Sequence, residues 1–247
     1  MEERLVKYLS SSGYVSRREA EDYIKRGLVK VNGNVVFDYG YIVKIDDDVL
    51  LDGASIKPQE NKVYYMMYKP VGYITLSKDN KGKTIYDLLD IDERIYPVGK
   101  FDYGVSGMLL LTNDSEFKRS IENPVIYIEN EYHIKVEGLL RKEESSKIQK
   151  GIEVGGIKYP PLKIMNVKYN DEKTTTFLDI VLKDNNNKEI KKIFSSLGHN
   201  VKSIKRTRIG NLRLDIKEGK YRSLTPHEVK ILKLIALGKI KHDKYYS

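Results

Sequence analysis

The segment from Tyr96 to Asp114 constrains the fold more than any other part of the chain. It has the sequence YPVGKFDYGVSGMLLLTND, in which three glycines surround Asp102. Because glycine accepts tight turns and positive φ angles, the first half of the segment predicts a turn that presents Asp102. The apolar run from Met108 to Leu111 predicts a strand buried on both faces. Asp102 is therefore expected at the edge of a core, either as a reactive carboxylate or as a hydrogen-bond acceptor within its own turn.

This segment resembles the signature GRLDxxTSGLLLLTND of the RsuA/RluB/RluE/RluF family of ribosomal RNA pseudouridine synthases. In this chain the signature stands as GKFDYGVSG over residues 99–107, with Lys100, Phe101 and Val105 in place of Arg, Leu and Thr. The resemblance implies that Asp102 is the catalytic residue and that Lys100 contacts RNA. It also implies that the chain isomerises uridine to pseudouridine in ribosomal RNA.

The charge of the chain is unevenly distributed. The 247 residues carry a formal net charge of +9, whereas residues 183–247 alone hold 17 basic and 6 acidic residues, a net charge of +11. Such a cluster suits a polyanion, because cations that neutralise phosphates release bound counterions. A solvated surface that aids solubility is the alternative.

Several classes of protein are disfavoured by composition. The chain has no Cys, which excludes disulfides, thiolate metal sites and a Cys nucleophile. The four His are scattered without the spacing of metal ligands, so no metal site is expected. There is no leader pattern, and no apolar run approaches the ~20 residues that cross a bilayer. A cytoplasmic protein with no membrane contact is expected.

Residues 1–60 predict a compact module of two helices and a hairpin. A helix is expected from Glu3 to Ser11, and a second begins at Ser16, which forms a capping-box pattern with Glu19. The pair Asn32-Gly33 between valines predicts a hairpin turn. The run SSGYVSRREAEDYIKRGLVKVNGNVV resembles the S4 RNA-binding domain. The residues that this resemblance directs toward RNA are Ser16, Arg17, Arg18, Lys25, Arg26 and Lys30.

The remainder of the chain, residues 61–247, is expected to form a catalytic domain after a polar linker near Lys57 to Lys62. Its strand and helix patterns predict a mixed α/β domain built on a mainly antiparallel sheet, so the whole chain is assigned to the α+β class. Glu131 to Val136 alternates and predicts a strand with Tyr132 facing inward. It resembles a family strand whose Tyr lies in the active site, which implies that Tyr132 stacks on the flipped base and assists proton transfer. A core aromatic is the alternative.

A basic amphipathic helix follows. Ile190, Ile193, Phe194 and Leu197 share one face, and Lys191 falls beside that face, where it is expected to be half buried. The stretch resembles the family motif NRQ(I/V)RRM, which implies that Lys191 pairs with the catalytic carboxylate. Lys188 and Lys192 point away from the apolar face and are assigned to RNA contacts.

The C-terminal region carries two further patterns. Residues 201–214, VKSIKRTRIGNLRL, resemble the family pattern VxxLxRxxIGxxxL, and phosphate contact is the simplest role for Arg206 and Arg208. Thr225, Pro226 and Glu228 predict a capped final helix.

These observations favour a site-specific ribosomal RNA pseudouridine synthase that needs no cofactor and acts on 23S rather than 16S RNA. Asp102, Tyr132 and Lys191 are its expected catalytic residues. The carboxylate can act as nucleophile at C1′ or as base at the 2′ position, and the sequence does not choose between them. Free ribosomal RNA and a subunit assembly intermediate are both open as partners, and no protein partner is required. The alternative function is a non-catalytic RNA-binding or ribosome-assembly factor that keeps the fold.

Overall fold

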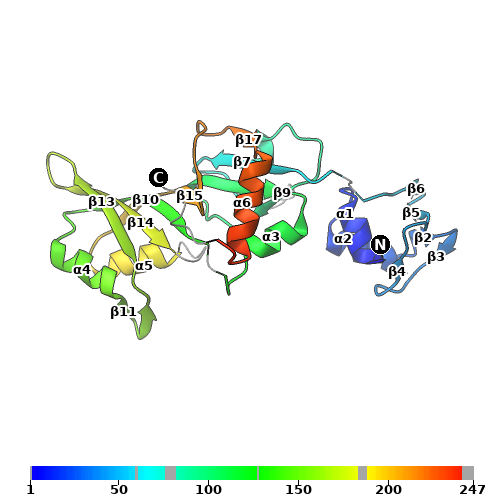
Figure 1. Ribbon diagram of the computed structural model, residues 1–247, viewed down its shortest axis with the longest axis horizontal. Helices are drawn as coiled ribbons and strands as arrows, with labels where there is room; N and C mark the ends of the chain where they lie inside the picture. Colours follow the sequence, from blue (N-terminus) through cyan, green and yellow to red (C-terminus); the bar gives the residue numbers. More distant parts are fainter. Residues whose placement is uncertain (1, 59–60, 76–81, 127, 183–187, 241–247) are drawn as a thin grey trace. The chain divides into compact units, whose positions relative to one another are not determined.

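Two compact units make up the protein (Figure 1). The computed structural model describes residues 2–58, 61–75, 82–126, 128–182 and 188–240. The first unit comprises Met1–Val63 and Ile91–Tyr96, and the second comprises Tyr64–Asp90 and Pro97–Ser247. The domain boundary expected between residues 60 and 61 stays a prediction, and part of the expected linker lies outside the described residues.

In its described residues, the first unit has two helices and two small antiparallel sheets. One sheet has the strand order β3-β2-β5-β6, and the other pairs β1 with β4. Its elements are β1 (Glu3–Arg4), α1 (Leu5–Ser11), α2 (Arg17–Lys25), β2 (Val29–Val31), β3 (Asn34–Val35), β4 (Ile42–Val43), β5 (Val49–Leu51) and β6 (Ala54–Ser55).

Local sequence signals explain the ends of these elements. The Ser16 hydroxyl accepts a hydrogen bond from the Glu19 amide at 3.2 Å, and the Glu19 side chain accepts from the Ser16 amide, which completes the expected capping box. Asn32 and Gly33 have φ angles of 50° and 82°, as a two-residue hairpin turn requires. Leu5, Leu9, Ala20 and Ile24 of the two helices pack on the buried valines of β2, β4 and β5.

The segment Ile91–Tyr96 lies far along the chain but packs within the first unit. The Tyr96 hydroxyl donates to the Ser10 carbonyl at 3.4 Å, and the Arg94 guanidinium lies 3.5 Å from the Glu19 carboxylate. The first unit is therefore not a simple N-terminal stretch of the sequence.

The second unit is built on one large sheet with helices packed against it (Figure 1). Its strands are β7 (Tyr64–Lys69), β8 (Tyr96–Val98), β9 (Val105–Thr112), β10 (Asn130–Glu137), β11 (Ile152–Val154), β12 (Ile157–Tyr159), β13 (Lys163–Tyr169), β14 (Thr175–Leu182), β15 (Val201–Ile209), β16 (Leu212–Arg213) and β17 (Tyr221–Ser223). Its helices are the 3-10 helix η1 (Ile85–Leu88) and the α-helices α3 (Ser115–Ile121), α4 (Lys142–Lys150), α5 (Lys188–Ser196) and α6 (Pro226–Ala236).

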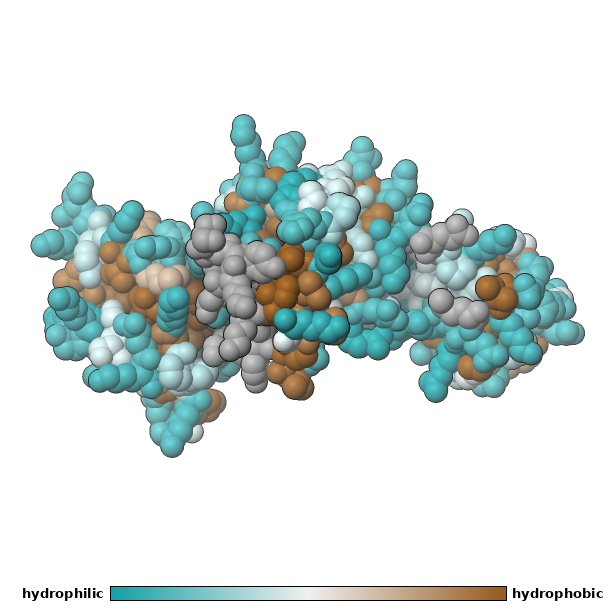
Figure 2. Space-filling model, viewed as in Figure 1, coloured by the Kyte–Doolittle hydropathy of each residue, from teal (hydrophilic) through white to brown (hydrophobic). Residues whose placement is uncertain are grey.

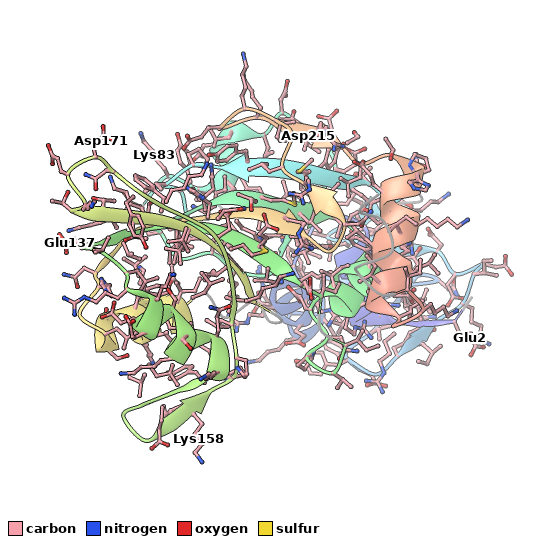
Figure 3. The ribbon with its side chains drawn as sticks, turned by 60° about the vertical axis from the view of Figure 1, so that its left-hand side comes forward. Glu2, Lys83, Glu137, Lys158, Asp171 and Asp215 are labelled. Atoms are coloured by element: carbon pink, nitrogen blue, oxygen red, sulfur yellow. The ribbon has the colours of Figure 1, made fainter. Side chains whose placement is uncertain are left out.

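The sheet has the strand order β13-β14-β10-β15-β9-β7-β17. The pair β9 and β15 is parallel, and the other pairs along this path are antiparallel, so the expected mainly antiparallel sheet is confirmed. Figure 3 shows β10, β14 and β13 side by side above α4 and α5, with Lys158 at the β11–β12 hairpin.

Two apolar clusters hold the helices on this sheet. Ile190, Ile193 and Phe194 of α5 pack with Ile148 of α4 against β10, β14 and β15. Phe117 and Ile121 of α3 and Leu232 of α6 pack against β7 and β9. Asp114 accepts from the amides at the start of α3, and the expected cap of the final helix is present, since Thr225 forms a capping box at the start of α6. Helix α4 carries no strong sequence signal and is not among the predicted elements.

Charged and polar side chains cover much of the face seen in Figure 2. None of the helices in the described ranges combines the length and apolar character that a membrane span requires.

Gly107 allows the two central strands to approach each other. Its φ angle is +104°, and a Cβ atom at this position would lie 2.2 Å from the carbonyl oxygen of Arg206 on β15. We expect Gly107→Ala to destabilise the protein by more than about 3 kcal/mol, because both the backbone angle and the strand spacing oppose a side chain. Urea unfolding followed by circular dichroism measures this loss.

Gly104→Ala is the matched control, since a Cβ atom there meets nothing within 4 Å. It should change the free energy of unfolding by less than about 1 kcal/mol. Equal effects of the two substitutions would contradict the assigned role of Gly107.

Candidate active site

Asp102 lies in a turn that leads into β9 and is half buried. Its backbone carbonyl accepts a hydrogen bond from the Val105 amide at 3.0 Å, which closes the turn. In the described part of the chain, the Asp102 carboxylate itself forms no hydrogen bond or ion pair. The carboxylate therefore does not serve its own turn, which favours the reactive role over the structural one.

A buried lysine supports this turn through a neighbouring loop. Lys69, at the end of β7, has no exposure to solvent and donates to the carbonyls of Pro70 and Tyr73 at 2.7 Å each. The loop that it closes presents the Gly72 amide, which donates to the Tyr103 carbonyl at 3.1 Å. Burial lowers the pKa of Lys69 to about 8, and the charge of Glu218 opposes that shift. Lys69 thus organises the backbone next to Asp102.

The strand register brings Tyr132 close to the same region. Tyr132 on β10 pairs with Arg206 on β15, and Arg206 pairs with Gly107 on β9. The Tyr132 side chain is fully buried in the same apolar cluster as Phe101. The expected stacking surface for a base is therefore covered, and the ring packs as a core aromatic in this structure.

Arg206 and Arg208 are also buried, at 2% and 4% exposure. The guanidinium of Arg208 contacts the carboxylates of Glu131 and Glu129 at 3.1 and 3.5 Å. Both guanidinium groups are thus enclosed by protein. An ion that is taken out of water needs partners inside the protein to replace its hydration. This geometry corrects the expected role of the two arginines in phosphate contact.

The basic residues of α5 are placed differently from expectation. Lys191 and Lys192 are exposed, and Lys188 begins the helix with its side chain outside the described part. No ion pair joins Lys191 to Asp102, both of which are described residues. The expectation of a half-buried Lys191 is wrong, since an ammonium without a buried partner is more stable in water.

The other expected RNA contacts are mostly open to solvent. Lys100, close to Asp102 in the chain, is exposed, as are Arg17, Arg18, Lys25, Arg26 and Lys30 in the first unit. Ser16 is half buried, and its hydroxyl serves the helix cap. Within the described ranges, no group of three His, Asp or Glu side chains has the arrangement of a metal site.

Two family models match the chain. Residues 3–49 match the S4 domain, and residues 63–227, more than half of the chain, match RNA pseudouridylate synthase. The chain belongs to the RNA pseudouridylate synthase family. The resemblance drawn from the Asp102 segment is therefore confirmed at the level of the family.

Individual relatives span almost the whole chain. Ribosomal large subunit pseudouridine synthase B of Bacillus subtilis (strain 168) is 38% identical over 237 residues, which cover 95% of this chain and 97% of that protein. An uncharacterized RNA pseudouridine synthase of Aquifex aeolicus (strain VF5) is 36% identical and covers 93% of this chain and 96% of its own length. A crystal structure of a pseudouridylate synthase superposes with a TM-score of 0.66 at 25% identity, over 93% of this chain and 99% of the other.

Sequence reasoning missed Lys69 altogether and missed the burial of Arg206. Lys69 follows an apolar strand and precedes a proline, and Arg206 alternates with Ile204 on a strand that carries three other basic residues. The alternation of faces along β15 gives a weak indication that Arg206 is buried, because it places Arg206 on the same face as the buried Ile204.

The pKa of Lys69 predicts how stability depends on pH. The ordinary pKa is 10.5, and in the folded protein it is lowered to about 8. Between these values the unfolded chain binds more protons than the folded one, so the free energy of unfolding contributed by Lys69 rises with pH, by up to about 1.4 kcal/mol per unit. Below pH 8 both states are protonated, and burial of the ammonium opposes folding.

We therefore expect the stability difference between the wild type and Lys69→Met to grow in favour of the wild type from pH 8 to pH 10. Lys230→Met, at an exposed lysine of α6, is the control. Its free energy of unfolding should differ from that of the wild type by the same amount at each pH. Chemical denaturation at each pH measures both. A flat difference for Lys69→Met would show that the ammonium is not desolvated as described.

Proposed function

We propose that this chain isomerises specific uridines to pseudouridine in ribosomal RNA, and that its target is the large-subunit RNA. The observation that carries the proposal is Asp102 of the family signature, half buried at the head of β9 with a carboxylate that its own turn does not use. The name of the Bacillus subtilis relative, ribosomal large subunit pseudouridine synthase B, supports the choice of RNA.

The reaction sets the role of each proposed group. Breaking the N-glycosidic bond and joining C5 of the base to the ribose changes no oxidation state, so a positioned carboxylate is the central requirement. Asp102 would act as the nucleophile at C1′ or as the base that removes the 2′ proton. The target nucleotide must leave its stack at a cost of about a few kcal/mol, and Tyr132 would meet it only after the packing around that ring opens.

Lys191 would act as a mobile cation rather than as a fixed partner of Asp102. It is exposed on α5 with Lys192 beside it, and its ammonium would approach either the carboxylate or a phosphate of bound RNA. A cation near a carboxylate favours the charged form that the reaction uses.

The first unit would dock structured RNA through the basic residues of α2. Arg17, Arg18 and Lys25 are exposed on this short helix, and phosphate contacts of this kind fix position without reading sequence. The partner would be ribosomal RNA, either free or within a subunit assembly intermediate. The site of action would be the cytoplasm.

Asp102→Asn tests the proposal directly, because it removes the charge and keeps the shape. With ribosomal RNA transcripts that carry tritium at uracil C5, we expect the rate of tritium release to fall by at least about 100-fold. RNA affinity, measured by filter binding, should change little.

Asp171→Asn is the control, at an exposed carboxylate in the turn between β13 and β14, and it should release tritium at the wild-type rate. Comparing 23S with 16S transcripts tests the choice of RNA. Tight RNA binding by the wild type without any tritium release would instead support a non-catalytic assembly factor.

The docking role of α2 predicts a separate effect. The double substitution Arg17→Ala with Arg18→Ala should weaken RNA binding and lower the slope of log affinity against log salt by roughly 1 to 2, because each lost phosphate contact removes about one released counterion. The turnover number at saturating RNA should be retained.

Lys44→Ala serves as the control, since Lys44 is exposed in the same unit but beside the acidic residues 46–48. Its salt slope should match the wild type. Unchanged affinity in the double variant would place the RNA contact elsewhere.

A further inference from the structure

Arg206 is a charged side chain in an unusual place. It lies on β15 in the middle of the large sheet, with 2% of its surface exposed. Burial lowers the pKa of its guanidinium, and the interaction with the Tyr132 phenol opposes that shift. A buried guanidinium carries a desolvation penalty of several kcal/mol, which its contacts must offset.

One group of contacts belongs to the segment that carries Asp102. The guanidinium carbon of Arg206 lies 4.3 Å from the centre of the Phe101 ring, and Phe101 directly precedes Asp102. The Arg206 Nε donates to the Met108 carbonyl of β9 at 2.8 Å. The backbones of Arg206 and Gly107 are also in close contact. Arg206 therefore contacts residues that precede and residues that follow Asp102 in the chain.

A second group of contacts belongs to β10. One terminal nitrogen of Arg206 donates to the Asn130 side-chain oxygen at 3.4 Å, and Tyr132 is the neighbour of Arg206 in the strand register. These contacts join the Asp102 turn to β10.

We propose that Arg206 is a positioning residue, which holds the Phe101–Asp102 turn against β10, the strand that carries Tyr132. This inference rests on the proposed function, because the groups that it positions are those assigned to the reaction. Arg206 is buried, so it would act through the residues that it contacts, such as Phe101. A side chain with one point charge, such as Lys, cannot make the same set of contacts.

The proposal predicts that Arg206 acts on turnover and not on RNA affinity. Arg206→Lys loses the planar stack on Phe101 and the fork of donors, and we expect kcat for tritium release to fall about 10- to 100-fold with KM within about threefold of the wild type. Arg206→Met also loses the charge, and its kcat should be lower still. The order wild type, Lys, Met is the expected signature of positioning.

Arg222→Lys is the matched control for the loss of a guanidinium. Arg222 on β17 pairs with Asp215 and Glu228, both at 2.8 Å, and is outside the proposed site. The Arg222→Lys substitution should lower the melting temperature. It should leave kcat unchanged at a temperature where circular dichroism shows that the variant is folded. A merely structural Arg206 would behave in the same way.

Phe101→Leu provides a test that leaves the arginine in place. It removes the ring that faces the guanidinium, and we expect kcat to fall several-fold with KM unchanged. This variant decides the question if both Arg206 variants fail to fold.

The outcomes separate the two proposals. If the wild type releases tritium while folded Arg206→Lys and Phe101→Leu keep the wild-type kcat, the positioning role is overturned and the proposed function stands. A wild type that binds RNA but releases no tritium overturns both. A loss of kcat that follows the predicted order, with RNA affinity retained, supports the positioning role.

Discussion

The buried guanidinium of Arg206 is the interaction on which the central part of this protein depends. Three adjacent strands meet around it, since β10, β15 and β9 contribute Tyr132, Arg206 and Gly107 at matching positions. The charge is tolerated there because backbone and side-chain acceptors and an aromatic face surround it. An apolar residue of similar size would fill the space but would not join the turn before β9 to β10.

A second buried cation acts on the other side of the same turn. Lys69 closes the loop 70–73 through two carbonyls, and that loop donates an amide to Tyr103. Lys69 thus acts on the Tyr103 carbonyl through that loop, and Arg206 contacts the Phe101 ring and the Met108 carbonyl. The Asp102 carboxylate itself is left without a protein partner in the described part of the chain. This division is what a reactive acid needs, because a rigid frame lowers the cost of orienting it and an uncommitted carboxylate can meet a substrate.

Local patterns predicted much of the architecture. The caps at Ser16 and Thr225, the Asn32-Gly33 turn and the apolar strand from Met108 all depend on neighbours within a few residues, and all are present. Periodicity placed the buried face of α5 correctly but misjudged Lys191, because a position at the margin of an apolar face is decided by what packs there. Helix α4 has one buried apolar residue, Ile148, and so offered no stripe to recognise.

The sequence alone determined the family, the two modules and the residue proposed to carry the chemistry, because a signature motif, capping residues and hydrophobic alternation are all local in the chain. Only the tertiary structure decided that Arg206 and Arg208 lie inside the protein and that Lys69 supports the Asp102 turn. It also decided that residues 91–96 belong with the first unit. Charge and burial oppose each other at the two arginines, and the outcome there depends on partners contributed by strands about 75 to 100 residues away, which no local pattern contains.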